Sequence, residues 1–269
     1  LEESAQQTDE EGVLIRPAIR NQHQFPKGAA PGTFLHELLE WCAQQGFDRI
    51  VENPDALRQQ LARWCSTRGW NEWVEPLEHW LLALIRTPLS LQRGGDEQSS
   101  LADLASLRPE LEFWFESRNV SIRQLDALVT RHTLNGADRP RAEANRFNGM
   151  LKGFIDLVFE HNGQYYVIDW KSNWLGPSEV AYTQDALARA ALDKRYDMQL
   201  CIYLLALHRH LRQTLPDYDY DHHIGGAMLV FLRGIQAPSR GVLRVKPPLA
   251  FIERLDDLMA GENHKEVVV

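Results

Sequence analysis

Residues 153–171 read GFIDLVFEHNGQYYVIDWK, two arms rich in aliphatic, β-branched and aromatic side chains with Asn162-Gly163 between them. An Asn-Gly pair flanked by such arms is the strongest short-range signal for a two-residue hairpin turn. If these two residues form the turn, the register of the arms places Asp156 directly opposite Asp169. The stretch therefore predicts an antiparallel hairpin that brings two carboxylates face to face.

The two opposed carboxylates require a compensating charge. Directly opposed residues have Cβ atoms about 5 Å apart, and like charges so placed are destabilising. A divalent cation between Asp156 and Asp169 would offset the repulsion, because hard cations such as Mg²⁺ prefer carboxylate ligands. Lys171 follows Asp169 by two residues, so strand alternation places it on the same face. Two acids and a lysine so arranged form the D…(D/E)-x-K pattern of metal-dependent nucleases.

A solvated sheet face is the competing interpretation of these charges. Asp and Lys on strands usually face water, and D-x-K is a common tripeptide. Here, however, most neighbours on both arms are apolar, which indicates burial on both faces. We therefore favour the metal site. The apolar neighbours are Phe154, Ile155, Leu157, Val158, Phe159, Val167, Ile168 and Trp170.

Length and composition fit a folded intracellular protein. With 269 residues, of which 44% are hydrophobic, the chain can bury the core of one large domain or of a domain with a helical extension. It contains no apolar run of the roughly 20 residues that span a membrane, and no signal peptide is recognisable. Its three cysteines lack C-x-x-C spacing, so we expect no disulfide framework, zinc knuckle or Fe-S cluster and a reducing cytoplasm.

The formal net charge of −8 disfavours strong autonomous binding to DNA, which depends on Lys and Arg. It is compatible with a nuclease whose strand is delivered by a partner. The chain also lacks the G-x-x-x-x-G-K-[ST] loop, so we expect no ATP site of that type in this segment.

Changes of composition divide the chain into three segments. Residues 1–20 are predicted to be an acidic flexible linker, residues 21–261 a folded nuclease-type domain, and residues 262–269 a tail. Within the domain, residues 31–108 are mostly helical in pattern and residues 109–261 are α/β. This predicts an α/β fold with a mixed β-sheet flanked by helices and a helical N-terminal part.

Hydrophobic periodicity and breakers place the individual elements. Between Gly46 and Gly69, Asn53-Pro54 offers a helix start, and a loop is expected at residues 93–100. The predicted helices cover about 31–46, 54–69, 71–86, 121–132, 178–215 (two helices meeting near Lys194) and 249–259. The predicted strands outside the hairpin are 111–116 and 227–232.

Several other residues are candidates for chemistry. His36 begins His-Glu-x-x-Glu, and since H-E-x-x-H needs a second histidine, a zinc-protease site is excluded. On a helical wheel His36 points away from the apolar stripe, so a surface histidine and a ligand fit equally well. Tyr196, Gln199 and Tyr203 share one helix face, where tyrosines are more often core than functional but a buried amide needs partners.

The remaining histidines are assigned to the surface. His208 and His210 are two residues apart and cannot converge from one helix face, and His222-His223 lies in a loop rich in Tyr and Asp. We expect all four to be solvated, with a weak metal or nucleic-acid contact at His222-His223 as the alternative.

Four motifs together resemble the C-terminal nuclease domain of the RecB family, within the PD-(D/E)xK superfamily. The resemblance runs in the same order from about residue 24 to residue 260. The motifs are residues 31–36 (PGTFLH), 149–156 (GMLKGFID), 168–176 (IDWKSNWLG) and 196–203 (YDMQLCIY).

The resemblance implies a restriction-endonuclease-like fold and a site with one or two Mg²⁺ ions. The implied catalytic residues are Lys171, Asp156 and Asp169. The implied metal ligands are His36, Asp156, Asp169, the main-chain carbonyl of Trp170 and, as an acid near the site, Glu112. Gln199, Tyr203 and Tyr196 are implied to bind substrate or support the site. Trp170 stands where the family usually has Tyr, a change that a main-chain ligand tolerates.

The resemblance also implies an exodeoxyribonuclease that acts in double-strand-break repair and DNA degradation. Its partners would be single-stranded DNA delivered by a helicase, RecC-like and RecD-like subunits, and RecA, with no membrane. The alternative is a catalytically silent docking or DNA-guiding module. Such modules lose the acids and the lysine, whereas Asp156, Asp169 and Lys171 are all present.

Overall fold

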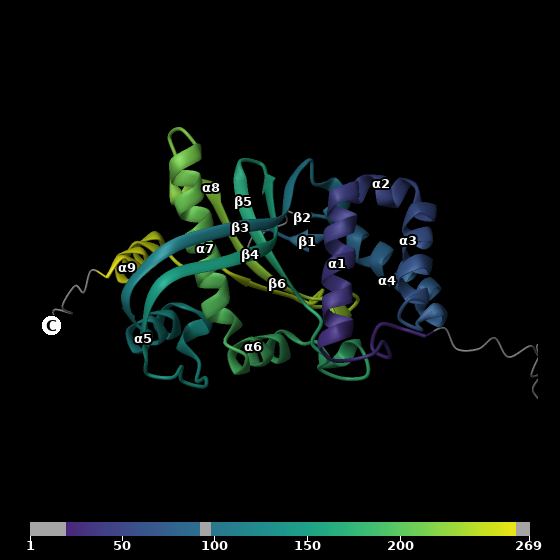
Figure 1. The fold of residues 1–269 in the computed structure, drawn as a ribbon, viewed down its shortest axis with the longest axis horizontal. Coiled ribbons are helices and arrows are strands. Elements are labelled where there is room, and N and C mark those ends of the chain that lie inside the picture. Colours follow the sequence, from purple (N-terminus) through teal and green to yellow (C-terminus); the bar gives the residue numbers. More distant parts are fainter. Residues whose placement is uncertain (1–19, 92–97, 262–269) are drawn as a thin grey trace, which may run out of the picture.

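The computed structural model describes residues 20–91 and 98–261, which form a mixed five-stranded sheet with helices around it (Figure 1). The predicted linker at 1–20, except Arg20, and the tail at 262–269 lie outside the described residues. The strand order is β3-β4-β5-β6-β7, antiparallel except for the parallel pair of β5 and β6. The strands are β3 (Ser106–Ser121), β4 (Arg146–His161), β5 (Gln164–Lys171), β6 (Ile224–Phe231) and β7 (Val242–Val245).

The predicted hairpin is confirmed in β4 and β5. Asn162 and Gly163 have φ angles of 50° and 79°, as both central residues of a type I′ turn require. The register holds from the turn back to Leu157 opposite Ile168. The ladder ends there, one pair before Asp156 and Asp169, whereas on its other edge β5 pairs with β6 from Tyr165 to Lys171. Asp156 and Asp169 occupy the next position of this register just beyond the ladder, so their direct opposition stays a prediction, while their charges do interact.

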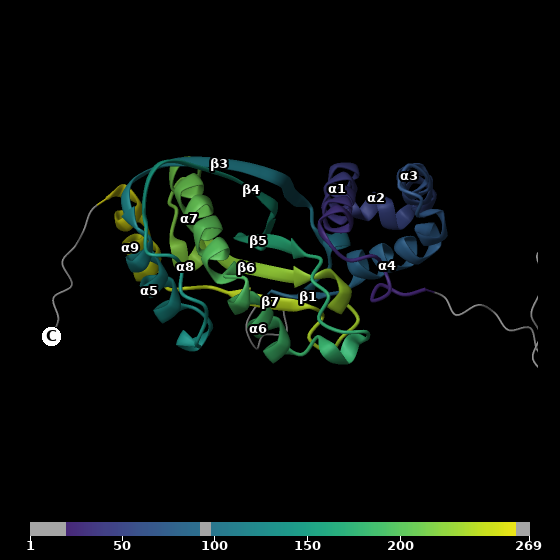
Figure 2. The same ribbon diagram turned by 60° about the horizontal axis from the view of Figure 1, so that its bottom comes forward.

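A long ribbon formed by β3 and β4 extends from this hairpin and arches over the helix α7 (Tyr196–Thr214; Figure 2). Side chains alternate along it between exposed and inward positions. The inward ring of Phe113 packs on Tyr203 of α7 and lies over Gly153, where an added Cβ would come within 2.6 Å of that ring. The sequence predicted only the middle of β3, because its ends lack the apolar alternation.

Four helices form the N-terminal part, in agreement with the predicted helical pattern. Pro54 begins α3, as expected, and Pro76 lies in the first turn of α4. A short helix, α2, fills the gap after Gly46, and Leu89–Ser90 (β1) pairs with Gln98–Ser99 (β2) where only a loop was predicted. The helices are α1 (Ala29–Gln45), α2 (Phe47–Glu52), α3 (Pro54–Ser66) and α4 (Val74–Arg86).

The N-terminal helices share a core with one face of the sheet. Of the four, α1 stands between the other three and the sheet (Figure 1). Trp80 of α4 donates its indole N–H to the carbonyl of Leu232, just after β6, at 2.9 Å. Around the opposite face lie α5 (Ile122–His132), α6 (Gln184–Asp193), α7, α8 (Tyr220–His223) and α9 (Leu249–Ala260). No helix in the described ranges is long and apolar enough to cross a membrane.

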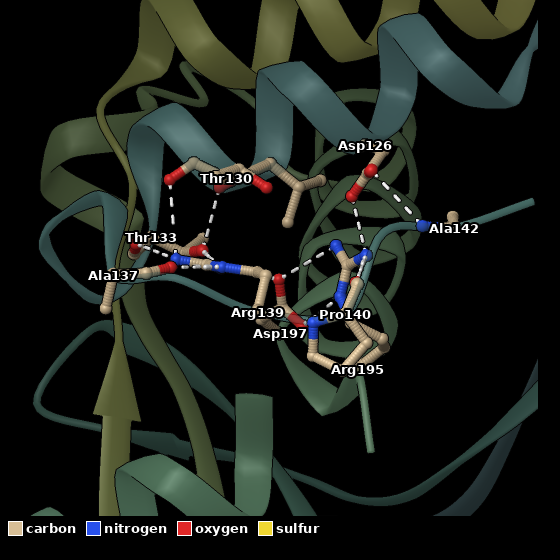
Figure 3. A network of polar contacts seen from close by, with 10 residues as sticks. Asp126, Thr130, Thr133, Ala137, Arg139, Pro140, Ala142, Arg195 and Asp197 are labelled. Atoms are coloured by element: carbon tan, nitrogen blue, oxygen red, sulfur yellow. Dashed lines mark hydrogen bonds and ion pairs between the residues drawn. The ribbon is translucent and has the colours of Figure 1, made fainter. Parts of the chain in front are cut away.

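A buried ionic network fixes the start of α7 (Figure 3). The carboxylate of Asp197 accepts a hydrogen bond from Arg139 at 2.7 Å and from Arg195 at 3.1 Å. Both Arg139 and Asp197 are almost completely buried. Arg195 also forms an ion pair with Asp126 of α5, and Arg139 donates to two carbonyls near the end of α5, those of Thr133 and Ala137. The network therefore ties α5 and the segment after it to the first turn of α7.

Removing the central carboxylate should destabilise the protein. Asp197→Ala leaves buried guanidinium groups without their counter-ion, so we expect the free energy of unfolding to fall by about 3–5 kcal/mol. Glu116→Ala breaks the exposed ion pair of Glu116 with Arg118, which water screens, and should leave the free energy of unfolding almost unchanged. Urea unfolding of both variants measures this, and an Asp197→Ala cost as small as that of the control would contradict it.

Candidate active site

Asp169 and Lys171 form a buried ion pair at the end of β5. The ammonium nitrogen of Lys171 lies 2.5 Å from Oδ2 of Asp169, which confirms that the two side chains share a face. Only 3% of the Asp169 side chain is exposed. Burial raises the pKa of Asp169 to about 6, because the charge of Lys171 only partly offsets the lost hydration and Asp156 adds repulsion. Asp169 is therefore a carboxyl group whose charged form is disfavoured by burial and only partly stabilised by Lys171.

Asp156 and His36 form the second pair. Oδ2 of Asp156 accepts a hydrogen bond from the main-chain nitrogen of Trp170 at 2.7 Å and lies 3.5 Å from Nδ1 of His36. Burial acts to lower the pKa of His36, but the hydrogen bond with Asp156 and the charges of Asp156 and Asp169 outweigh it and raise that pKa. Of the two interpretations left open by the helical wheel, the structure places His36 at the carboxylates.

Helix α1 reaches the site because of a glycine. A Cβ on Gly32 would lie 3.0 Å from the hydroxyl oxygen of Ser172, the residue that follows Lys171. A larger residue would press on this hydroxyl, so glycine allows α1 to pack closely against the chain leaving β5. Since His36 lies one helical turn beyond Gly32, this contact fixes His36 next to Asp156.

Helix α7 holds Lys171 from the other side. The Lys171 ammonium donates to Oε1 of Gln199 at 2.9 Å and lies 3.8 Å from the centre of the Tyr196 ring. Gln199 in turn donates from Nε2 to the hydroxyl of Tyr203 at 2.8 Å. Of the three residues predicted on one helix face, Tyr196 and Gln199 contact the lysine and Tyr203 contacts Gln199, so the partly buried amide of Gln199 has a partner at each end.

Glu112 does not join this cluster. It forms an ion pair with Lys152 on the ribbon and is 42% exposed. Glu110 takes the position opposite Asp156 in the β3–β4 register, and its pKa is raised by burial and by the charges of Asp156 and Glu40. Sequence reasoning missed Glu110 because the register between β3 and β4 depends on a helix and a long connection rather than on a turn.

The cluster forms two pairs rather than a complete metal-coordinating group. Among the described residues, no three His, Cys, Asp or Glu side chains are grouped so as to hold one metal ion. In this structure the ammonium group of Lys171, rather than a metal ion, balances the charge of Asp169. The donors nevertheless fit a hard divalent ion, because they comprise two carboxylates and an imidazole.

Two other features lie away from the cluster. A hollow of about 1230 Å³ beside β7 and the end of α5 contains none of its residues. His208, expected at the surface, is buried, because its Nδ1 lies 2.9 Å from the Tyr218 hydroxyl and Tyr220 packs on its ring. His210 and His222 are exposed, as expected, and His223 is partly buried.

Comparison with known proteins agrees with this geometry. A sequence profile of the PD-(D/E)XK nuclease superfamily matches residues 10–262, and the chain therefore belongs to that superfamily. Within it, the chain is similar to subunits of one enzyme. It is 40% identical over 259 residues to the RecBCD enzyme subunit RecB of Escherichia coli, covering 94% of this chain and 21% of that protein.

Two further relatives carry the same name. The RecB subunit of Haemophilus influenzae is 36% identical over 255 residues, 91% of this chain and 20% of the relative. That of Mycobacterium tuberculosis H37Rv is 29% identical over 263 residues, 87% of this chain and 24% of the relative. The chain thus spans between about a fifth and a quarter of the length of these relatives.

The buried carboxylate should make stability depend on pH. Because the pKa of Asp169 is raised from 3.8 to about 6, the folded protein binds this proton more tightly than the unfolded chain. The free energy of unfolding therefore falls as pH rises from about 4 to about 6, by at most about 3 kcal/mol. Asp169→Asn removes this contribution, so its stability relative to wild type should increase over that interval.

Urea unfolding in EDTA at several pH values measures this difference. The exposed Asp193→Asn on α6 is the control and should follow the wild-type pH profile. Parallel profiles for Asp169→Asn and wild type would show that the Asp169 carboxyl does not carry a raised pKa.

Proposed function

We propose that this chain is a Mg²⁺-dependent DNA nuclease domain that hydrolyses phosphodiester bonds. The observation that carries the proposal is the convergence of Asp156, Asp169 and Lys171 with His36 in a member of a nuclease superfamily. Each element around the site supports it. The end of β5, the strand β4, the helix α1 and the helix α7 all direct polar side chains to one point.

The proposed metal ligands are Asp156, Asp169, His36 and the main-chain carbonyl of Trp170. The hydrogen bond from the Trp170 nitrogen to Asp156 supports the last of these, because it holds the main chain at this residue against the carboxylate. The bound ion would polarise the scissile phosphate and lower the pKa of a water molecule. Glu110, beside Asp156, replaces Glu112 as the acid we propose for a second ion.

Lys171 is the proposed catalytic cation. Its ammonium is pre-positioned by Gln199 and the Tyr196 ring, so it keeps two contacts when the carboxylate of Asp169 turns to another partner. From this position it would stabilise negative charge on the scissile phosphate or orient the attacking water. Tyr203 acts through Gln199, since its hydroxyl accepts the amide N–H and thereby fixes which end of the amide faces Lys171.

The relatives suggest the setting of the reaction. We propose an exodeoxyribonuclease activity on single-stranded DNA within a RecBCD-like helicase-nuclease, with RecC-like and RecD-like subunits, and RecA as a further partner. The net charge of −8 supports a strand delivered by a helicase rather than captured from solution. Three buried free thiols support a reducing cytoplasm. The silent-module alternative is not favoured, because the acids and the lysine are present and assembled.

Single substitutions should abolish cleavage without unfolding the protein. Asp169→Ala removes a metal ligand together with a buried charge, and Lys171→Gln removes the cation but keeps an amide beside Gln199. We expect cleavage of single-stranded DNA in Mg²⁺ to fall at least ~100-fold for each variant, the order of magnitude that one electrostatic group contributes.

Cleavage rates of the purified variants test the loss of activity, and thermal melting tests whether they remain folded. The exposed neighbours Asp193→Ala and Lys194→Gln are matched controls and should retain full activity. Near wild-type cleavage by Asp169→Ala or Lys171→Gln, with an unchanged melting temperature, would refute the site assignment.

Calcium should compete with magnesium at this site. Ca²⁺ takes the same oxygen ligands at longer distances and with looser geometry, so it should bind but support little cleavage. Titration of Ca²⁺ into a reaction at fixed Mg²⁺ should therefore lower the rate progressively. Undiminished cleavage at a large excess of Ca²⁺ would contradict the proposed ligand set.

A further inference from the structure

The outer face of the β3–β4 ribbon carries an unusual set of exposed side chains. Because strand residues alternate between faces, the exposed residues of both strands share this side. We refer to it as the ribbon face. It consists of Glu112, Trp114, Glu116 and Arg118 on β3 and of Arg146, Asn148, Met150, Lys152 and Phe154 on β4.

Large apolar groups are concentrated on the ribbon face. Trp114 is 68% exposed, Met150 58% and Phe154 44%, and among the described residues only Trp174 and Val180 join them as exposed large hydrophobic residues. Single exposed apolar residues are common, but a group that includes a tryptophan indicates a binding surface. The opposite side of the same ribbon is already packed on α7, so this surface is not required for the core.

The ribbon face begins at the proposed active site. Along β4, Phe154 precedes Asp156 by two residues, about 7 Å along the strand, although Ile155 and Leu157 pack into different cores and the regular alternation of faces is interrupted at Asp156. The register sets Glu112 opposite Phe154 and Trp114 opposite Lys152. A molecule that lies on the ribbon face from Trp114 past Phe154 therefore ends close to Asp156 along the strand.

The ribbon face is less negatively charged than the chain as a whole, which favours binding of a polyanion there. It carries three cationic side chains and two carboxylates, whereas the whole chain has a net charge of −8. Both carboxylates are paired, Glu112 with Lys152 and Glu116 with Arg118. Lys152 also lies 5.3 Å from the centre of the Phe154 ring, so a cation and an aromatic face are presented together.

We propose that the ribbon face is a track for single-stranded DNA, on which unpaired bases stack against Trp114 and Phe154 while the phosphates lie near Lys152. Stacking on aromatic side chains interleaved with cations is how proteins bind single strands without reading sequence. A duplex cannot use such a surface, because its bases are already stacked on one another. The track rests on the proposed nuclease function and adds to it the surface that guides the strand.

The spacing of the ribbon fits an extended strand. Residues that share a face recur every two positions, or about 6.7 Å along a β-strand. This is about twice the rise per nucleotide in duplex DNA, about 3.4 Å, so a single strand with its bases unstacked matches one nucleotide to each same-face position. The continuity with Asp156 favours DNA over a protein partner, because a docked protein would have no reason to begin at the acids.

The test is binding of a fluorescein-labelled oligothymidylate of 20 nucleotides to the whole chain, by fluorescence anisotropy in EDTA. Trp114→Ala and Phe154→Ala should each weaken binding by about 5-fold to 150-fold, the range for loss of one stacked base. Trp114→Tyr should restore most of the affinity, since it keeps an aromatic face. Val180→Ala, which removes an exposed apolar group outside the ribbon face, should bind as wild type does.

A cleavage assay in Mg²⁺ separates the track from the site. Trp114→Ala should raise KM for the oligonucleotide with little change in kcat, and should leave hydrolysis of the single-nucleotide ester thymidine 5′-(p-nitrophenyl phosphate) unchanged. Affinity of both alanine variants within twofold of wild type would overturn the track and assign the face to protein contacts. If DNA binding depends on Trp114 but neither the wild type nor any variant cleaves DNA, the track is supported and the proposed nuclease activity is refuted.

Discussion

The burial of the Asp169 carboxylate at the end of β5 is the constraint around which the site is arranged. β5 lies between β4 and β6, so a charge on it is removed from water and must be balanced locally. Lys171 supplies the balancing charge from two residues further along the same strand. Because that ammonium is itself nearly buried, it needs further acceptors, and α7 provides them through Gln199 and Tyr196.

A second buried cation holds the chain around this strand end. The guanidinium of Arg233, after β6, donates to the main-chain carbonyls of Gln22, Phe25, Pro26 and Ser172. It thereby ties the segment before α1 to the residue after Lys171. The contacts of α1, α7 and the N-terminal segment are thus separate interactions that meet within three residues of Asp169, which makes the geometry of the site a property of the whole fold.

Local signals predicted those parts of the fold that are determined by neighbouring residues. The Asn162-Gly163 turn fixed the register of β4 and β5, and from it the shared face of Asp169 and Lys171 followed. Helix periodicity placed Tyr196, Gln199 and Tyr203 together, although it did not reveal that their common partner is Lys171.

Features that depend on distant residues were missed or left open. The position of His36 depends on the close approach of α1 at Gly32, which no helical wheel shows. Glu110 was passed over for Glu112 because the register of β3 with β4 is set across α5 and a long connection, and because Glu110 has a φ of 48°, which interrupts the strand pattern. His208 is buried by Tyr218 and Tyr220, which arrive from a segment beyond its own helix.

The irregularities of β3 have a consequence for association between molecules. β3 is an outer strand of the sheet, so over 16 residues one side of its backbone pairs with no strand of the described part of the chain. Such an edge is a template for strands of other chains. Pro109 has no N–H to offer, Glu110 turns the backbone out of the extended conformation, and a register shift between Ser117 and Val120 twists the far end. These breaks leave no long regular stretch of free N–H and C=O groups, so a long exposed ribbon can persist without recruiting copies of itself into a continuous sheet.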